Sequence, residues 1–559
     1  MKASILFLCY IFSLCRADLD TEWWKHTIIY AIVPFSFKDS DGDGIGDLKG
    51  ITSKLDYIEG LGIETIQLTP IYETPFKDIG YDITDYYKID KMYGTMDDFD
   101  ELVSELKKRD MKLIMDMVIN HSGDQHEWFQ KSIDRIDPYT DFYVWKDSKG
   151  FNNETGQEIP PNKWFSLFSP TYEAGTAWEW NEKRKQFYLH QFLPEQVDFN
   201  LNNPVLKSEL KKMIEFWLDK GVAGFRFDAT PYFFENKDFR DAVYYYDQVN
   251  QPETLEFLHE LRLSLDEYNK EHGGIERIFI AEAHILDSEV VKYFGKKDYP
   301  IMHFPYSFNF EYLEGHINPF LFEMYTNYYI ESLPKNAVTA WMSQDHDVNR
   351  IGSRMTPEYS DIITIASMLL PGTAGCYYGQ EIGMLNGLVR QDQFKDFSDH
   401  GARDPARLIM QWDDSMNAGF TNNSVPFLPP NSDYFERNVE SQQHQENTHL
   451  SLFKDLSVMR KTNTLKFGNY KTYYSPYSDS EFIHVMTRSH EDRMVIVVTN
   501  FSVFSSSRFN MSRIIQNLPK RIVLATSSIN SGYAKGSVLG NEIPMEFMMR
   551  PLSCLVFEA

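Results

Sequence analysis

The chain has 559 residues and a formal net charge of -26 at pH 7, with 42% hydrophobic and 24% charged residues. This composition is ordinary for a soluble globular protein with one large domain and smaller ones, and the negative charge argues against nucleic acid as a partner, because phosphate binding needs a basic surface. After the first residues, no stretch approaches the roughly 20 apolar residues of a membrane span, so we expect no transmembrane segment.

The first residues, MKASILFLCYIFSLCRA, combine a basic start, an apolar run and small residues at Cys15 and Ala17. This pattern predicts a signal peptide over residues 1–17 and hence a secreted, extracellular protein. Cleavage would remove Cys9 and Cys15 and leave two cysteines far apart in sequence, Cys376 and Cys554, so a disulfide-built scaffold is not expected.

Several Asn-X-Ser/Thr sequons are typical of a glycoprotein, and they lie at Asn153, Asn422, Asn500 and Asn510. A further sequon at Asn120 falls within a cluster of polar residues described below, and we expect no glycan there. The sequence leaves the oligomeric state open.

The chain begins its regular structure with an apolar run at 28–37, and an acidic stretch, DSDGDGIGDLKG, starts directly after it at Asp39. Carboxylates at alternating positions with a glycine at the sixth resemble a calcium-binding loop, but Gly50 occupies the twelfth position, where a bidentate Glu normally completes the ligands. The preceding run is typical of a strand, so a helix-loop-helix switch is disfavoured. A structural metal site and a metal-free acidic loop both remain open on this pattern.

Short apolar runs then alternate with amphipathic helices along most of the chain. The runs lie at 28–37, 63–71, 112–120, 224–229, 278–283, 299–306, 337–343 and 373–379. The helix expected at 95–109 begins with a Thr95 cap, and that at 206–221 ends at Gly221. Eight such units predict an α/β fold of the (β/α)8 TIM-barrel type.

Two regions depart from the alternation. Residues 122–190, rich in Trp, Pro, Gly and Asn, follow the third strand and are far longer than a βα loop of about 2 to 6 residues, which predicts an inserted subdomain B. Near the C-terminus, alternating strands around a SHED turn predict an antiparallel hairpin. We therefore expect a catalytic barrel over 18–121 and 191–475 and a C-terminal β-sandwich domain over 476–559.

Polar residues gather where the barrel strands end, which is the face that carries active sites in this fold. The third strand ends at Asp116, Asn120 and His121; the later strands end at Arg226, Asp228, Glu282, His346 and Asp347. Arg226 and Asp228, two apart on one strand, share a face, and the guanidinium should keep Asp228 ionised. A single strand-end carboxylate is more often a structural ion pair or a helix cap, but several converging carboxylates favour an active site.

Three acids on different strands suit glycosidic bond cleavage, in which one carboxylate attacks the anomeric carbon and another protonates the departing oxygen. A high aromatic content, 15%, also suits a site that grips sugar rings, although core packing uses most of it. A metal hydrolase is the rival use of acids and histidines, but the chain has no HExxH motif, and a serine hydrolase would need GxSxG, which is also absent.

The strings DMVINH, GFRFDA, IAEAH and SQDHDVNR, in this order, resemble the four sequence regions of the α-amylase superfamily, glycoside hydrolase family 13. Further strings, GYDITDYY, YLHQFLPEQVDFN, PGTAGCYYGQEIGM and RDPAR with QWDDSMNAGF, resemble the insect maltase branch of secreted α-glucosidases. The resemblance runs from about residue 24 to the end and implies a retaining enzyme that removes terminal α-linked glucose from oligosaccharides.

By this resemblance Asp228 is the nucleophile, Glu282 the acid/base and Asp347 the carboxylate that stabilises the transition state. The resemblance also implies a substrate-binding set, consisting of Tyr81, Asp82, His121, Arg226, His346 and Arg407. The acidic loop resembles the structural calcium loop of this branch, whose ligands here would be Asp39, Asp41, Asp43, Ile45 and Asp47. Calcium is therefore the one expected cofactor.

A few positions depart from the family pattern. Asp345 stands where the family usually has Asn, Ile119 replaces a frequent Pro, and 408–410 differ from the usual Thr-Pro-Phe or Thr-Pro-Met. Ala229 resembles α-1,4-cleaving members, which favours maltose-like substrates, with sucrose also open. A sucrose-acting transglucosidase and a non-catalytic binding protein are the alternatives; the three acids count against the second.

Overall fold

The computed structural model describes residues 22–559 apart from 169–174, 242–248, 397–401, 475–480 and 516–517, so the expected signal peptide lies outside the described residues. Eight parallel strands close a barrel in the order in which they occur in the chain. These strands are β1 Ile28–Ile32, β2 Thr65–Leu68, β5 Lys112–Met117, β13 Gly224–Phe227, β14 Ile278–Ala281, β17 Phe304–Ser307, β18 Ala340–Trp341 and β19 Thr373–Tyr377. Seven of them fall within a predicted run and β17 extends one residue beyond its run, so the (β/α)8 prediction is confirmed.

The first run is shorter as a strand than predicted. β1 ends at Ile32, and Pro34–Phe37 form the one-turn helix α2, because Pro34 at its first turn presets the helical φ. All four residues of α2 are buried, so the chain turns inward before the acidic loop begins. The apolar run alone could not show this change, since both halves are buried.

Helices surround the barrel, and the two whose ends were predicted are placed as expected. α5, Met96–Lys108, begins with a capping box between Thr95 and Asp98. α7, Pro204–Asp219, buries the predicted apolar face against the sheet. The remaining helices of the barrel layer are α3 Leu48–Ser53, α4 Leu55–Gly60, α8 Pro252–His272, α9 Asp287–Val290, α10 Pro319–Ser332, α11 Ile351–Arg354 and α12 Pro357–Leu369.

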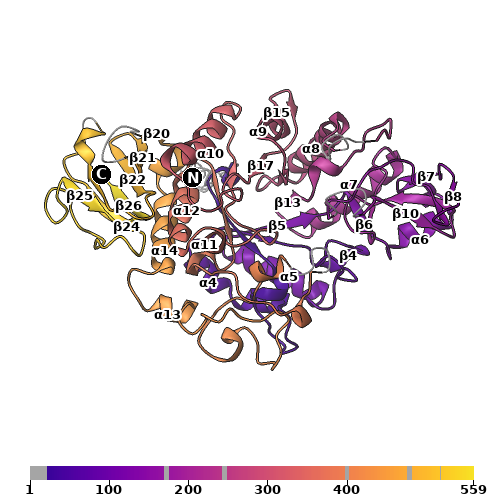
Figure 1. Ribbon diagram of the computed structural model, residues 1–559, viewed down its shortest axis with the longest axis horizontal. Helices are drawn as coiled ribbons and strands as arrows, with labels where there is room; N and C mark the ends of the chain where they lie inside the picture. The colour runs from indigo at the N-terminus through magenta and orange to yellow at the C-terminus, as the bar shows by residue number, and fades with distance from the viewer. Residues whose placement is uncertain (1–21, 169–174, 242–248, 397–401, 475–480, 516–517) are drawn as a thin grey trace, which may run out of the picture.

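Between β5 and α7 the chain makes a separate small lobe, which lies at the opposite end of the molecule from the C-terminal strands (Figure 1). The antiparallel pair β6 His121–Gly123 and β12 Gln196–Asp198 joins this lobe to the barrel. The lobe contains α6 Glu127–Ile133, the short pair β8 Phe151–Asn152 and β9 Gln157–Glu158, and a sheet of β10 Trp178–Asn181, β11 Gln186–Leu189 and β7 Trp145–Lys146. The lobe runs from His121 to Asp198 and so extends beyond the predicted bounds of 122–190.

After β19 a helical segment, α13 Val439–Gln443, α14 His449–Arg460 and α15 Asn463–Phe467, leads to a C-terminal antiparallel sheet. Its strand order is β20 Asn469–Tyr474, β21 Ile483–His490, β22 Arg493–Asn500, β26 Ser553–Glu558 and β24 Val523–Ser527. The pair β23 Ser507–Asn510 and β25 Glu546–Met549 packs on this sheet through a common apolar core. The predicted hairpin is confirmed, and its sheet starts before residue 476.

The structure bears on three smaller expectations. Cys376 and Cys554 are both buried and free. Asn500 is fully buried, and its amide nitrogen donates to the carbonyls of Ser505, Met549 and Arg550, so this sequon cannot carry a glycan in the folded protein. Among the described residues, no helix is long and apolar enough to cross a membrane.

Candidate active site

The carboxylates predicted at the strand ends meet around one guanidinium. Arg226, on β13, is 2% exposed and lies 2.9 Å from Asp228 Oδ1, 3.1 Å from Glu282 Oε2 and 2.8 Å from Asp116 Oδ2. Asp228 directly follows β13 and Glu282 directly follows the neighbouring strand β14. Adjacent parallel strands that end at the same level therefore bring these two acids to a single cation.

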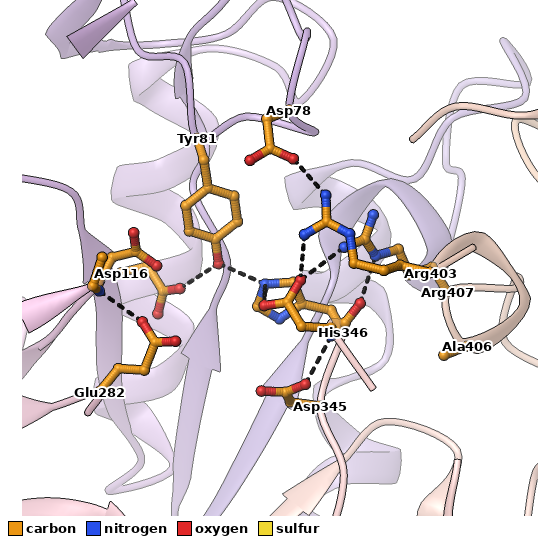
Figure 2. A network of polar contacts seen from close by, with 12 residues as sticks. Asp78, Tyr81, Asp116, Glu282, Asp345, His346, Arg403, Ala406 and Arg407 are labelled. Carbon is orange, nitrogen blue, oxygen red and sulfur yellow. Dashed lines mark hydrogen bonds and ion pairs between the residues drawn. The ribbon is translucent and has the colours of Figure 1, made fainter. Parts of the chain in front are cut away.

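Asp347 belongs to a second polar cluster, whose other members His346, Arg403 and Arg407 are labelled in Figure 2. Its Oδ1 lies 2.7 Å from Arg403 and 2.9 Å from Arg407, and its Oδ2 lies 3.2 Å from His346 Nε2. The Tyr81 hydroxyl donates to Asp116 over 2.7 Å and lies 2.9 Å from His346 Nε2, with the two rings stacked. Tyr81 thus connects the two clusters.

A cavity of about 430 Å³ opens between the clusters, and Asp228, Glu282 and Asp347 all contribute to its wall. Tyr81 and His121 line it as well, and the inserted lobe covers it with Phe168 and Phe192. The other lining residues are Asp78, Leu167, Gln196, Ala229, Tyr232, His284, Tyr312 and Arg403. A mixed wall of carboxylates and aromatic faces is suited to a sugar, whose hydroxyls need acceptors and whose ring faces are apolar.

The predicted substrate-binding residues fall into two groups. Tyr81 and His121 lie in the cavity wall, whereas Arg226, His346 and Arg407 lie behind it and hold the wall carboxylates in place. Asp82 is buried beneath the wall, where Thr74 Oγ1 and the main-chain N–H groups of Lys77 and Asp78 donate to its carboxylate. Asp82 therefore shapes a loop in this structure and does not face the cavity.

The comparisons with known proteins bear directly on this geometry. A family model described as "Alpha amylase, catalytic domain" matches residues 31–468. The chain belongs to the α-amylase family.

Relatives in this family agree over most of their length. The chain is 36% identical to Maltase A1 of Drosophila melanogaster, with 95% of each chain covered, and 37% identical to the salivary alpha-glucosidase of Aedes aegypti, with 84% of each covered. It is also 36% identical to the human amino acid transporter heavy chain SLC3A1, over 91% of this chain and 76% of the relative. The named glucosidases and the catalytic-domain match identify this family member as a glycosidase.

Solved structures of the family superpose closely. A mutant of isomaltulose synthase from Erwinia rhapontici NX5, in complex with its natural substrate sucrose, matches with a TM-score of 0.82 and 28% identity. The match covers 96% of this chain and 99% of that chain. The barrel, the inserted lobe and the C-terminal sheet therefore occur together in related enzymes.

Asp78 and Arg403 are among the cavity residues of this α-amylase family member that the sequence-based prediction did not include. Asp78 and Arg403 form an ion pair of 2.7 Å, and the same guanidinium contacts Asp347 and Asp396. Asp78 lies just before the GYDITDYY string, which itself contains Asp82, and the RDPAR string contains both Arg403 and Arg407. Only the backbone path selects Asp78 over Asp82 and Arg403 over Arg407 as the one that faces the cavity.

The site shares one proton between its two central acids. Burial, and then the adjacent Glu282 carboxylate, raise the pKa of Asp228 well above its ordinary value, so the prediction that Arg226 keeps Asp228 ionised is wrong for the sugar-free site, where these two effects outweigh the guanidinium. Burial also acts to raise the pKa of Glu282, but Arg226 and His284 outweigh it and lower that pKa to about 2. The pair therefore keeps one charge and one proton over a wide pH range, as two close carboxylates must.

Asp347 differs from this pair. Burial opposes its ionisation, but His346, Arg403 and Arg407 together lower the pKa of Asp347 far below its ordinary range. It therefore stays negatively charged throughout the pH range of the folded protein, which is what stabilisation of a positively charged transition state requires.

Asp345, Ala229 and residues 408–410, which the sequence analysis singled out, leave the three cavity carboxylates in place. Asp345 Oδ1 accepts a 2.7 Å hydrogen bond from the Asp347 N–H. Ala229 adopts a left-handed φ of 51°, and its N–H donates to Glu282 Oε2 over 2.7 Å. Residues 408–410 are buried in the core behind the site.

The acidic loop after α2 brings carboxylates together as a metal site would. Ligand atoms of Asp39, Asp41 and Asp43 lie within 4.8 Å of one another. Burial, and then repulsion by the neighbouring carboxylates, raise the pKa of Asp43, whereas hydrogen bonds from Thr421 and from main-chain N–H groups outweigh burial and lower the pKa of Asp39. Gly44 is required at the turn, because its φ is 96° and an added Cβ would lie 2.6 Å from the Val425 carbonyl oxygen.

These oxygen donors fit a hard cation such as Ca²⁺, with the Ile45 carbonyl as the further donor expected from the loop pattern. Asp47 has a second role, since its carboxylate accepts from Ser40 and caps α3 through the Gly50 N–H. A bound calcium ion would supply charge balance and rigidity to the loop and would take no part in the chemistry.

Proposed function

We propose that the protein is a secreted, retaining α-glucosidase that releases terminal, non-reducing α-1,4-linked glucose from maltose-like oligosaccharides and from sucrose. The observation that carries the proposal is the placement of Asp228, Glu282 and Asp347 around one cavity, with Arg226 bridging the first two. The names of the maltase and salivary α-glucosidase relatives support the substrate class and the secretion, as does the leader pattern in residues 1–17.

In the proposed reaction, the Asp228 carboxylate attacks the anomeric carbon while Glu282 gives its proton to the leaving oxygen. The glycosidic C–O bond breaks as the glucosyl–Asp228 ester forms. Glu282 then removes a proton from water, which attacks the same carbon and releases glucose with retained configuration. The single proton shared by the pair meets this need, provided that it resides on Glu282 in the sugar complex.

The remaining polar groups would position the sugar. We assign Asp347, Asp78 and Arg403 to its hydroxyls, and Tyr81 and His121 to the floor beneath the ring, from their places in the cavity wall. Arg226, His346 and Arg407 would act from behind by fixing the carboxylates. Ca²⁺ would be held by the loop from Asp39 to Asp47, away from the reaction.

A transglucosidase that acts on sucrose is the second candidate, because the isomaltulose synthase that matches this fold has sucrose as its natural substrate. The covalent intermediate is the same in both cases, and only the acceptor, water or a sugar hydroxyl, differs. A binding role alone is disfavoured because all three carboxylates are present and converge on the cavity.

The test is glucose release from maltose, sucrose and isomaltose by the wild type and by Asp228→Asn, with transfer products measured in parallel. We expect maltose to be the best of the three and the variant to lose several orders of magnitude in kcat. Dominant transfer products from sucrose would favour the transglucosidase. No turnover of any of these sugars by the wild type would overturn the proposal.

A further inference from the structure

Behind the catalytic acid Glu282 lies a second cluster that the proposed reaction does not use. It consists of His284, Glu311 and Asp345, whose potential ligand atoms all lie within 4.8 Å of one another. The three residues follow β14, β17 and β18, which are neighbours in the barrel, so the cluster is built on rigid strand ends. It is separate from the acidic loop at Asp39.

Glu311 is the unusual member of this cluster. It is 5% exposed, and among the described residues neither of its carboxylate oxygens has a hydrogen-bond partner. Arg354 acts on Glu311 electrostatically, but its guanidinium donates to the main-chain carbonyls of Leu313, Phe310 and Ser343. Burial, and then the Asp345 carboxylate, raise the pKa of Glu311 well above its ordinary value, so this buried group is stable either as the neutral acid or with a cation bound to its unpartnered oxygens.

His284 gives the cluster both a nitrogen ligand and an entrance. Its ring stacks on Phe308 with centroids 3.9 Å apart and lines the substrate cavity, from which an ion could enter. Its Nε2 lies 3.3 Å from Glu282 Oε1. A group bound at His284 would therefore sit beside the catalytic acid.

We propose that His284, Glu311 and Asp345 form an inhibitory site for a borderline divalent cation, with Zn²⁺ as its representative. One imidazole and two carboxylates are a ligand set that Zn²⁺ accepts, and they leave a further coordination position open toward the cavity. Mg²⁺ and Ca²⁺ prefer all-oxygen sites and should bind weakly here.

Inhibition follows from the position of the site. A cation at His284 lies within reach of the Glu282 carboxylate and would engage it, so that Glu282 could no longer deliver a proton to the leaving oxygen. The anionic ligand set depends on Asp345, which stands where the family usually has Asn. An amide oxygen at this position would be a weaker, uncharged ligand.

The first measurement is calorimetric titration of the calcium-loaded protein with ZnCl₂ at neutral pH and without sugar, so that it is independent of the proposed function. We expect Glu311→Gln to weaken Zn²⁺ binding at least tenfold. Asp345→Asn, which restores the residue common in the family and is expected to fold, should do the same. The matched control is Asp41→Asn, in the other acidic cluster, and it should bind Zn²⁺ as the wild type does.

Enzyme assays and crystallography complete the test. Zn²⁺ should suppress glucose release by the wild type, EDTA should reverse the effect, and Glu311→Gln should need at least tenfold more Zn²⁺ for the same inhibition, while Mg²⁺ should not inhibit. Zinc anomalous scattering should place the ion between the three side chains. Unchanged Zn²⁺ affinity in both Glu311→Gln and Asp345→Asn, or an anomalous peak only elsewhere, would overturn the proposal.

Discussion

Asp78 and Asp82 show how one residue type serves two purposes a few positions apart. Asp78 faces the cavity and pairs with Arg403, whereas Asp82 is buried and accepts hydrogen bonds from its own loop. Burial raises the pKa of Asp82 to about 6 despite these bonds. The ionised carboxylate therefore stabilises its loop through hydrogen bonds, but its burial carries a desolvation cost.

Asp78→Asn should therefore reduce kcat/KM for maltose by about 10-fold to 100-fold, because a group that contacts the sugar is lost while the fold is kept. Asp82→Asn should instead lower the free energy of unfolding by roughly 1 to 3 kcal/mol, since an amide nitrogen would face main-chain donors. Steady-state kinetics and thermal melts of both variants check this. If Asp82→Asn lost more kcat/KM than Asp78→Asn, Asp82 would be a substrate-binding residue, as first predicted.

The pH dependence of activity should follow the shared proton of Asp228 and Glu282. Activity should persist to low pH, because the pKa of Glu282 is about 2 and the pair keeps its negative charge above that pH. Activity should fall on the alkaline side, where the pair loses its remaining proton, whose pKa is raised. A protonated His284 stabilises the form of the pair in which both carboxylates are ionised, and so lowers the pKa at which the pair loses its last proton. His284→Gln should therefore move the alkaline limb of kcat/KM to higher pH.

The control for this prediction is His272→Gln, which changes an exposed histidine at the end of α8 and should leave the profile in place. A downward shift of the alkaline limb in His284→Gln would contradict the assigned sign. An unchanged alkaline limb would show that His284 does not influence the pKa of the pair.

At the scale of elements, the acidic loop is the segment whose stability should depend on a ligand. The carboxylates of Asp39, Asp41 and Asp43 repel one another unless a cation lies between them. EDTA should lower the melting temperature of the wild type and added Ca²⁺ should restore it. Asp43→Asn should reduce this calcium dependence, whereas Asp492→Asn in an exposed turn should not. A melting temperature that changes with neither EDTA nor Ca²⁺ would indicate a metal-free loop.

Strands and helices could be predicted from the sequence where an apolar pattern ended at a turn residue or a helix cap. All eight barrel strands and the capping box at Thr95 followed from apolar runs and a cap, but Pro34–Phe37 did not, because a buried helical turn and a buried strand have the same composition. Asp228 and Glu282 lie at the cavity because each directly follows a strand, whereas Asp347 lies in the loop after β18. Asp78 and Arg403 lie in irregular loops, where sequence spacing does not decide which way a side chain points.

Buried hydrogen bonds connect the C-terminal sheet to the helices outside the barrel. Arg488 of β21 is 2% exposed and donates to the carbonyls of Leu369, Leu465 and Gly468, at the ends of α12 and α15. Burial lowers the pKa of Arg488 to about 10. The contacts run from the sheet to the outside of the barrel and none reaches the cavity.

Arg488→Met should lower the free energy of unfolding by roughly 2 to 4 kcal/mol, because several buried carbonyls lose their donor. The KM for maltose should not change. Arg508→Met, at an exposed pair with Glu546, is the matched control and should be nearly neutral. Thermal melts followed by kinetics measure both effects, and equal melting temperatures for the two variants would argue against this role of Arg488.

In the proposed mechanism, Asp228 attacks the sugar and becomes covalently attached to it. The most direct measurement is mass spectrometry of peptides from protein trapped with a fluorinated α-glucosyl fluoride, which slows hydrolysis of the intermediate. We expect one added fluoroglucosyl group on the peptide that contains Asp228, and none in Asp228→Asn. A label on another residue of the wild type, or β-glucose as the first product of maltose hydrolysis, would contradict it.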